Sequence, residues 1–283
     1  MTDFPAQFAG LVDDAAMFPP GNAEVADAVA AHRDYRQSWF APMVGPLVVS
    51  DQRLAELGRA LGPEAEDLDV SVVNTSGAGG LLSLAGRQLT AVRVRAVESA
   101  LRDLDDLAGN AARVVSAAGQ LHESMQVFVE LPFAPGWERA VEVVEAGGLL
   151  GKIRTGGLAA SDTPSTGQLA RQLSVLVEAD LAFKATAGLH HAWPTPGLEP
   201  DRPAQHGFLP LLAAMHALVE GASEDEAADL LAGEDRTGIL ADLAGWSESR
   251  SSRVRRRLRS FGCCGVTEPV ADLVALGLLE DPT

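Results

Sequence analysis

Short β-type runs alternate with helical patterns along the whole chain, and this alternation restricts the fold more than any other feature. Most runs are rich in valine, as expected for parallel strands that are buried on both faces. We predict eight strands, at residues 10–16, 45–50, 68–74, 91–98, 125–131, 148–154, 181–187 and 259–264. With helices between them, they indicate an α/β fold, a single (β/α)8 TIM barrel spanning residues 1–283.

The segments between these runs carry leucine or valine every three or four residues, which is typical of helices with one buried face. We predict helices at 51–61, 99–108, 137–146 and 166–178, and a last helix capped by Thr267. The glycine-rich stretch 75–90 is predicted to be a loop. The much longer segment 188–258, between strands seven and eight, is predicted to carry helices near 207–220 and 224–232 and to act as a lid or specificity element.

Composition excludes several classes of partner. The net charge of −17 argues against nucleic acid, because phosphate binding needs a basic face. No run approaches the roughly 18 apolar residues of a membrane helix, and no secretory signal begins the chain. The only cysteines, Cys263 and Cys264, are neighbours and poorly placed for a disulfide. We therefore expect a cytoplasmic protein without a membrane partner, and the sequence is compatible with a homo-oligomer.

Lysine is almost absent: Lys152 and Lys184 are the only two lysines among 22 basic residues. Each lies in a predicted strand and is followed by small residues, which leave room for a substrate carbonyl. Arginine cannot form an imine, whereas a partly desolvated lysine can. Adjacent strands lie about 4.8 Å apart, so we expect the two amines to approach each other and the pKa of one to fall.

Other polar residues fall at the carboxyl ends of the predicted strands, where barrel enzymes have their active sites. Arg154 lies two residues after Lys152 and so points to the same face, where Glu130 could neutralise it or polarise a substrate hydroxyl. A purely structural alternative remains, in which Glu130, Glu98 and Asp13 form ordinary ion pairs with the lysines.

These motifs resemble those of deoxyribose-phosphate aldolase, a class I aldolase family built on this barrel. The run Lys152-Ile153-Arg154-Thr155-Gly156 is similar to the Lys-Thr-Ser-Thr-Gly run of the family, and Lys184-Ala185-Thr186-Ala187-Gly188 is similar to its Lys-Ala-Ser-Gly-Gly run. The sequences around Asp13, Glu130 and Gly262-Cys263-Cys264-Gly265-Val266 also resemble the family at strands one, five and eight.

The resemblance implies that Lys152 forms the Schiff base, that Lys184 lowers its pKa and that Asp13 belongs to the proton-handling network. The chain departs from the family in strand four, where the aspartate that relays protons has no counterpart and only Glu98 is acidic. Cysteines also replace the serines of the phosphate cradle at 263 and 264, and the segment 188–258 has no equivalent in the family.

Three histidines form a second group, because His190 and His191 follow strand seven and His206 lies further along the same segment. With Glu130 or Asp13 they could bind a metal, although their spacing matches no strong ligand motif. His190 could instead contact substrate or act in acid–base chemistry. The main-chain amides of 262–266, which lead into the last helix, could hold a carboxylate or phosphate.

The leading hypothesis is a lyase of the aldolase type that forms an imine with a small anionic carbonyl substrate and needs no cofactor or metal. Its catalytic residues would be Lys152, Lys184 and Asp13. Its substrate-binding residues would be Glu130, Arg154, Thr155, Thr186, His190, Gly262 and Cys263. Two alternatives stay open: a metal-dependent hydrolase or isomerase that uses His190, His191 and Glu130, and a barrel that binds a small molecule without catalysis.

Overall fold

The computed structural model confirms the predicted closed barrel of parallel strands, and it describes residues 4–62, 67–87, 89, 91–197 and 204–282. Each strand pairs in parallel with the next along the chain, and the eighth strand closes the ring against the first. The strands are β1 Val12–Asp14, β2 Val44–Ser50, β3 Leu68–Asn74, β4 Val92–Ala100, β5 Gln126–Glu130, β6 Leu150–Arg154, β7 Phe183–Thr186 and β8 Leu258–Cys263.

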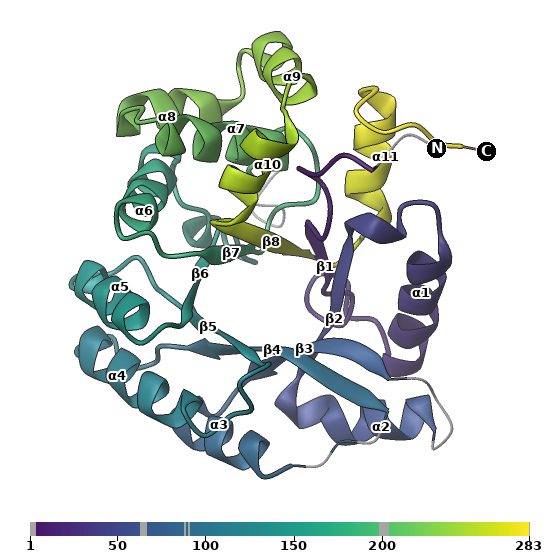
Figure 1. Cartoon of the computed structure of the whole chain (residues 1–283), viewed down its shortest axis with the longest axis vertical. Helices are drawn as coiled ribbons and strands as arrows, with labels where there is room; N and C mark the ends of the chain where they lie inside the picture. The colour runs from purple at the N-terminus through teal and green to yellow at the C-terminus, as the bar shows by residue number, and fades with distance from the viewer. Residues whose placement is uncertain (1–3, 63–66, 88, 90, 198–203, 283) are drawn as a thin grey trace.

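Helices surround this ring on the outside, as Figure 1 shows. They are α1 Val25–Gln37, α2 Leu54–Leu61, α3 Gly77–Ala85, α4 Leu107–Ala118, α5 Trp137–Ala146, α6 Thr166–Glu178, α7 Phe208–Val219, α8 Glu224–Ala232, α9 Arg236–Ala244, α10 Glu248–Arg255 and α11 Thr267–Ala275. None of the helices in the described part of the chain has the length and hydrophobicity that crossing a membrane requires.

The largest apolar core lies between the strands and the helices. Each strand exposes alternate side chains to the helices, and these side chains bury the apolar stripes that the sequence pattern predicted. On β8, for example, Phe261 points outward and stacks on Phe208 of α7 with ring centroids 5.5 Å apart. The side chains that point into the barrel therefore need not be apolar, and the candidate site lies among them.

The long connection between β7 and β8 is confirmed, and its described residues form α7, α8, α9 and α10; residues 198–203 of the predicted segment lie outside the described residues. Helix α7 is apolar nearly all round because it packs against both the barrel and the neighbouring helices α6, α8, α9 and α10. In Figure 1 these helices lie beyond β6, β7 and β8 on the outside of the ring.

Three local predictions were wrong. The stretch 75–90 was expected to be a loop, but it contains α3, because Leu81 and Leu84 bury one face of a helix. The helix expected at 99–108 begins only at Leu107, because Ser99 and Ala100 continue β4 by pairing with β5. Thr267 does not cap the last helix but is its first residue.

We expect Phe261→Ala to lower the free energy of unfolding by about 3–5 kcal/mol, because it removes a buried ring and leaves a cavity beside Phe208. The matched control is Leu158→Ala, at an apolar side chain that is 68% exposed, which should change it by less than about 0.5 kcal/mol. Urea unfolding followed by circular dichroism measures both, and equal midpoints for the two variants would show that the stacked rings add little.

Candidate functional site

The two lysines lie side by side inside the barrel. Lys152 on β6 and Lys184 on β7 are direct partners in the parallel pairing of these strands. Their side chains are only 6% and 1% exposed. Both ammonium groups reach the same carboxylate, that of Glu98, with Nζ to oxygen distances of 2.7 Å. The expected approach of the two amines in one water-poor place is therefore confirmed.

Glu98 on β4 is the centre of this arrangement. Its Oε2 contacts Lys152 and its Oε1 contacts Lys184, and the hydroxyl of Ser71 on β3 donates to Oε1 at 2.7 Å. The carboxylate is buried, and burial by itself would raise its pKa. The two ammonium groups outweigh this effect and hold the pKa of Glu98 far below its ordinary value. Glu98 is thus an anion that binds both lysines.

Asp13 on β1 extends the network on the other side of Lys184. Its Oδ2 accepts hydrogen bonds from the Lys184 ammonium and, at 2.9 Å, from the hydroxyl of Ser260 on β8. Burial raises the pKa of Asp13, and the charge of Lys184 only partly opposes this rise. A glycine at position 45 is required here, because a Cβ atom would lie 2.2 Å from the other oxygen of Asp13.

Glu130 and Arg154 form the outer part of the network. Glu130 Oε2 lies 3.1 Å from the Lys152 ammonium, and Oε1 lies 3.8 Å from the Arg154 guanidinium. The side chain of Glu130 is 21% exposed and that of Arg154 is 50% exposed. The network therefore changes from buried at Lys184 to solvent-accessible at Arg154.

The expected fall in a lysine pKa is wrong. Burial does lower the pKa of Lys152, but the charges of Glu98 and Glu130 more than compensate, so the net direction is upward. Burial likewise lowers the pKa of Lys184, but the charges of Asp13 and Glu98 outweigh this effect, so the pKa of Lys184 is also raised. The sequence argument considered only the second lysine, a cation that would lower the pKa of the first. In the structure, carboxylates contact both amines and stabilise their charged forms.

The residues after each lysine do not hold open the space that the sequence suggested. The buried Thr155 hydroxyl donates to the main-chain oxygens of Thr186 and Ala187, so it joins two loops and does not face the lysines. Gly156 and Gly188 bring these loops together, since a Cβ at either one would meet the other at 3.3 Å. Their small size therefore serves backbone packing.

Gly262 lies beside Thr186 at the end of β7, as their pairing in the sheet shows. A Cβ atom at Gly262 would approach the Thr186 hydroxyl to 3.4 Å, so both positions border the same part of the barrel mouth. Asp14, by contrast, points away from the network and pairs with His32 of α1 at 3.0 Å. Of the adjacent aspartates, only Asp13 belongs to the site.

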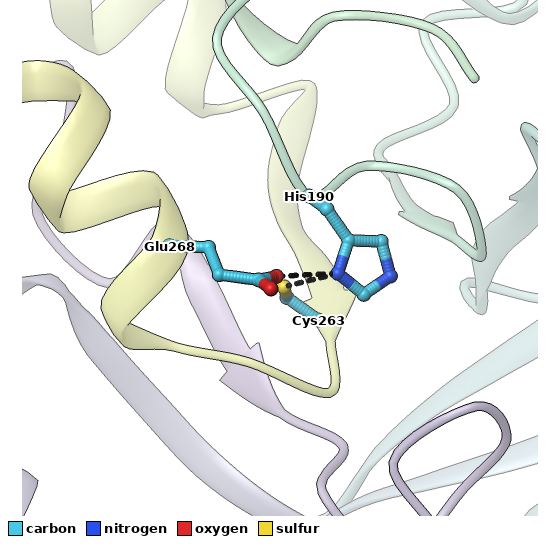
Figure 2. A group of neighbouring side chains, drawn as sticks. All are labelled: His190, Cys263 and Glu268. Carbon is cyan, nitrogen blue, oxygen red and sulfur yellow. Dashed lines mark hydrogen bonds and ion pairs between the residues drawn. The ribbon is translucent and has the colours of Figure 1, made fainter. Parts of the chain in front are cut away.

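His190 and Cys263 meet at the rim of the barrel, together with Glu268 of α11, as Figure 2 shows. Nδ1 of His190 lies 2.7 Å from Glu268 Oε2 and 3.7 Å from Cys263 Sγ, and Nε2 lies 3.8 Å from Cys264 Sγ. These thiol contacts raise the pKa of His190. Burial raises the pKa of the Cys263 thiol, so this thiol keeps its proton and carries no charge. The negative charge that stabilises a protonated His190 is therefore that of the Glu268 carboxylate.

The metal set that the sequence suggested is not brought together. His191 turns to Asp272 at 3.3 Å, and Glu130 pairs with Lys152 and Arg154 inside the barrel. His206 bonds the main-chain oxygen of Pro164 at 2.8 Å. Among the described residues, the group that could hold a metal consists of His190, Cys263 and Glu268.

Sequence reasoning gave no role to three members of these clusters, Ser71, Ser260 and Glu268. The two serines were detectable in principle, because each lies on the inward face of its strand by the period-two rule. Ser260, for instance, lies two residues before Gly262 on β8. Glu268 carried no such signal, since its contact with His190 joins positions 78 residues apart in the chain.

A separate groove lies at the opposite end of the barrel, at the amino ends of the strands. It has a volume of about 470 Å³ and is lined by residues of α1, β2, β3 and β4. Arg93 and Arg95, two of its cations, are paired with Asp67 or Asp69. Active sites of barrel enzymes lie at the carboxyl ends of the strands, so the lysine network and the rim are the better candidates.

Comparison with known proteins adds no assignment. No family model matches the chain, and no curated protein is significantly similar to it. The likeness to deoxyribose-phosphate aldolase therefore rests on the strand-end motifs alone.

We expect Glu98→Gln to lower the free energy of unfolding by about 3–5 kcal/mol, because it leaves two buried ammonium groups short of an anion. In the double variant Glu98→Gln/Lys184→Met, the loss should be smaller than the sum of the two single losses by about 1–3 kcal/mol. Denaturant unfolding of all four proteins gives this coupling. Strict additivity of the two single losses would contradict a direct Glu98–Lys184 interaction. The control is Glu142→Gln, which removes a carboxylate from an exposed ion pair with Arg139.

Alkaline pH should weaken the fold through the same lysines. Their pKa values are raised in the folded protein, so the folded state holds more protons than the unfolded state above about pH 10.4. The stabilisation is complete below that pH and is lost as the pH rises through the folded pKa values. The free energy of unfolding should fall more steeply above pH 10.4 for the wild type than for Lys184→Met; parallel curves would contradict the raised pKa.

Proposed function

We propose that the protein is a lyase of the aldolase type, in which Lys152 forms an imine with a small anionic carbonyl compound. One observation carries this proposal: Lys152 and Lys184 share the carboxylate of Glu98, yet only Lys152 lies next to the exposed part of the network. The fold supports it as well, because barrel enzymes bind their substrates at the carboxyl ends of the strands, and Glu130 and Arg154 are the last residues of β5 and β6.

The two lysines differ in a way that assigns their roles. Lys184 is enclosed by Asp13, Glu98 and the ring of Phe128, whose centroid lies 5.5 Å from Nζ. It has no open side from which a carbonyl carbon could approach. Lys152 contacts Glu130, which is partly exposed, so a substrate that enters from the barrel mouth meets Lys152 first. Lys152 is the nucleophile, and Lys184 fixes Glu98 in place.

Imine formation requires Lys152 to lose a proton that the resting network retains. Glu130, 3.1 Å away and nearer to solvent than Glu98, is the acceptor. The neutral amine then adds to the carbonyl carbon, and Glu130 returns the proton to the resulting hydroxyl group, so that water leaves and the protonated imine forms. The imine withdraws electrons from the neighbouring carbon–carbon bond, and so its cleavage or formation becomes feasible.

Arg154 supplies the recognition of an anion. Its guanidinium lies 3.8 Å from Glu130, is half exposed and projects from the same face of β6 as Lys152. A substrate carboxylate or phosphate would take the place of Glu130 beside Arg154. This exchange would free Glu130 to accept the Lys152 proton, which links substrate binding to activation of the amine.

Borohydride trapping tests the imine directly. The wild type, incubated with glyoxylate, pyruvate or glyceraldehyde 3-phosphate and then with sodium borohydride, should gain a stable adduct that peptide mapping places at Lys152. Because the pKa of Lys152 is raised, the yield should rise toward alkaline pH.

The matched control is Lys152→Arg, which keeps the positive charge beside Glu98 but cannot form an imine. It should stay folded and lose the adduct. An adduct that persists in this variant would refute the assignment. Binding of these compounds by the wild type without any adduct would instead favour a barrel that binds a small molecule without catalysis.

A further inference from the structure

Three metal-binding atom types converge at the rim of the barrel, outside the lysine network. Nδ1 of His190, Sγ of Cys263 and a carboxylate oxygen of Glu268 all lie within 4.8 Å of one another. They come from the loop after β7, the end of β8 and the first turn of α11, and Figure 2 shows them pointing toward one another. We propose that His190, Cys263 and Glu268 bind a zinc ion or a similar divalent transition metal.

The spacing of the atoms suits a tetrahedral ion. With zinc–nitrogen and zinc–sulfur bonds of about 2.0 and 2.3 Å, the two ligand atoms are about 3.6 Å apart. Nδ1 of His190 and Sγ of Cys263 are 3.7 Å apart. The 2.7 Å contact from Nδ1 to Glu268 Oε2 would have to lengthen to about 3.3 Å, and the exposed Glu268 side chain is free to make that change.

The donor set selects the class of metal. Imidazole and thiolate favour zinc, cobalt or copper over magnesium and calcium, which prefer oxygen ligands. The burial of Cys263 and the partial burial of His190 restrict the movement of both ligands. Three protein ligands leave a fourth position for water or for the oxygen of a carbonyl or carboxylate ligand, as in catalytic rather than structural zinc sites.

Cys264 has a different place in this arrangement. Its Sγ lies 3.8 Å from Nε2, whereas Cys263 and Glu268 contact Nδ1. The group of converging ligand atoms does not include this sulfur. Metal binding would release the protons that the metal-free site keeps on His190 Nδ1 and on the Cys263 thiol. A hydrogen bond from Nε2–H to the Cys264 sulfur would then keep Nδ1 turned toward the ion, which is the usual role of a group behind a histidine ligand.

The same residues could be interpreted as a nucleophile, Cys264, with His190 as base and Glu268 behind it. The position of Cys263 argues against this. In such a series the imidazole contacts the nucleophile through one nitrogen and the carboxylate through the other. Here Nδ1 of His190 faces both the Cys263 sulfur and the Glu268 carboxylate, so the series leaves Cys263 without a role. Convergence of nitrogen, sulfur and oxygen on one point is what a metal ion requires.

Cobalt titration of the metal-free, full-length protein tests the site. Co²⁺ should bind at one equivalent per chain with an intense near-ultraviolet band from the thiolate, and Zn²⁺ should displace it. Cys263→Ser should abolish the band, because it removes the thiolate ligand, and should weaken binding by more than the roughly 10–100-fold that loss of an outer-shell partner costs. Glu268→Gln, at an exposed position where folding is not at risk, should keep the band and weaken binding by about 10–100-fold.

Neighbouring residues provide matched controls. His191→Asn should keep both the band and the affinity, since His191 turns to Asp272 and is not a ligand. Cys264→Ser should keep the band and lower the affinity by no more than about 10–100-fold, since Cys264 contacts only the other nitrogen of the histidine ligand. Lys152→Arg should also bind cobalt normally, which separates this site from the imine proposal. Absence of the band in the folded wild type would overturn the proposal, as would a band that survives Cys263→Ser. So would rapid, His190-dependent alkylation of Cys264 in a protein that binds no cobalt.

Discussion

A single buried carboxylate, that of Glu98, holds the interior of the barrel together. Two ammonium groups and a hydroxyl meet it, from β6, β7 and β3, and Lys184 carries the connection on to Asp13 of β1. Buried charges are tolerated only when they are paired, so each of these side chains depends on the others. Removal of Glu98 would leave two cations without compensation inside a ring of apolar strands. The polar interior is therefore one interaction shared among strands distant in the sequence.

This network determines what chemistry the barrel can do. At rest both lysines are held as cations, and the carboxylates that hold them also suppress nucleophilicity. Activity would require an incoming anion to displace Glu130 from Arg154 before an amine is freed. Such a coupling would keep the amine inert until a substrate of the right charge is bound.

The rim cluster of His190, Cys263 and Glu268 lies at the same end of the barrel as the outer part of the network, because Cys263 follows Gly262, the partner of Thr186. The two groups differ in chemistry. One offers amines and carboxylates that are mostly buried, whereas the other offers an imidazole, a buried thiol and an exposed carboxylate. The outer part of the network lies at the carboxyl ends of β5 and β6, and the rim cluster lies at the carboxyl end of β8.

The sequence by itself determined the barrel and the shared face of the lysines within their strands, because strand periodicity and the alternation of strands with helices can be read from local segments. It placed α5, α6 and α8 closely, since their apolar spacing and end signals are also local. It could not fix the sign of the lysine pKa shifts, because the sign depends on the distances to Glu98, Glu130 and Asp13. It could not find Glu268 either. Only the tertiary structure decided which charges meet, since those contacts join residues on separate strands and helices.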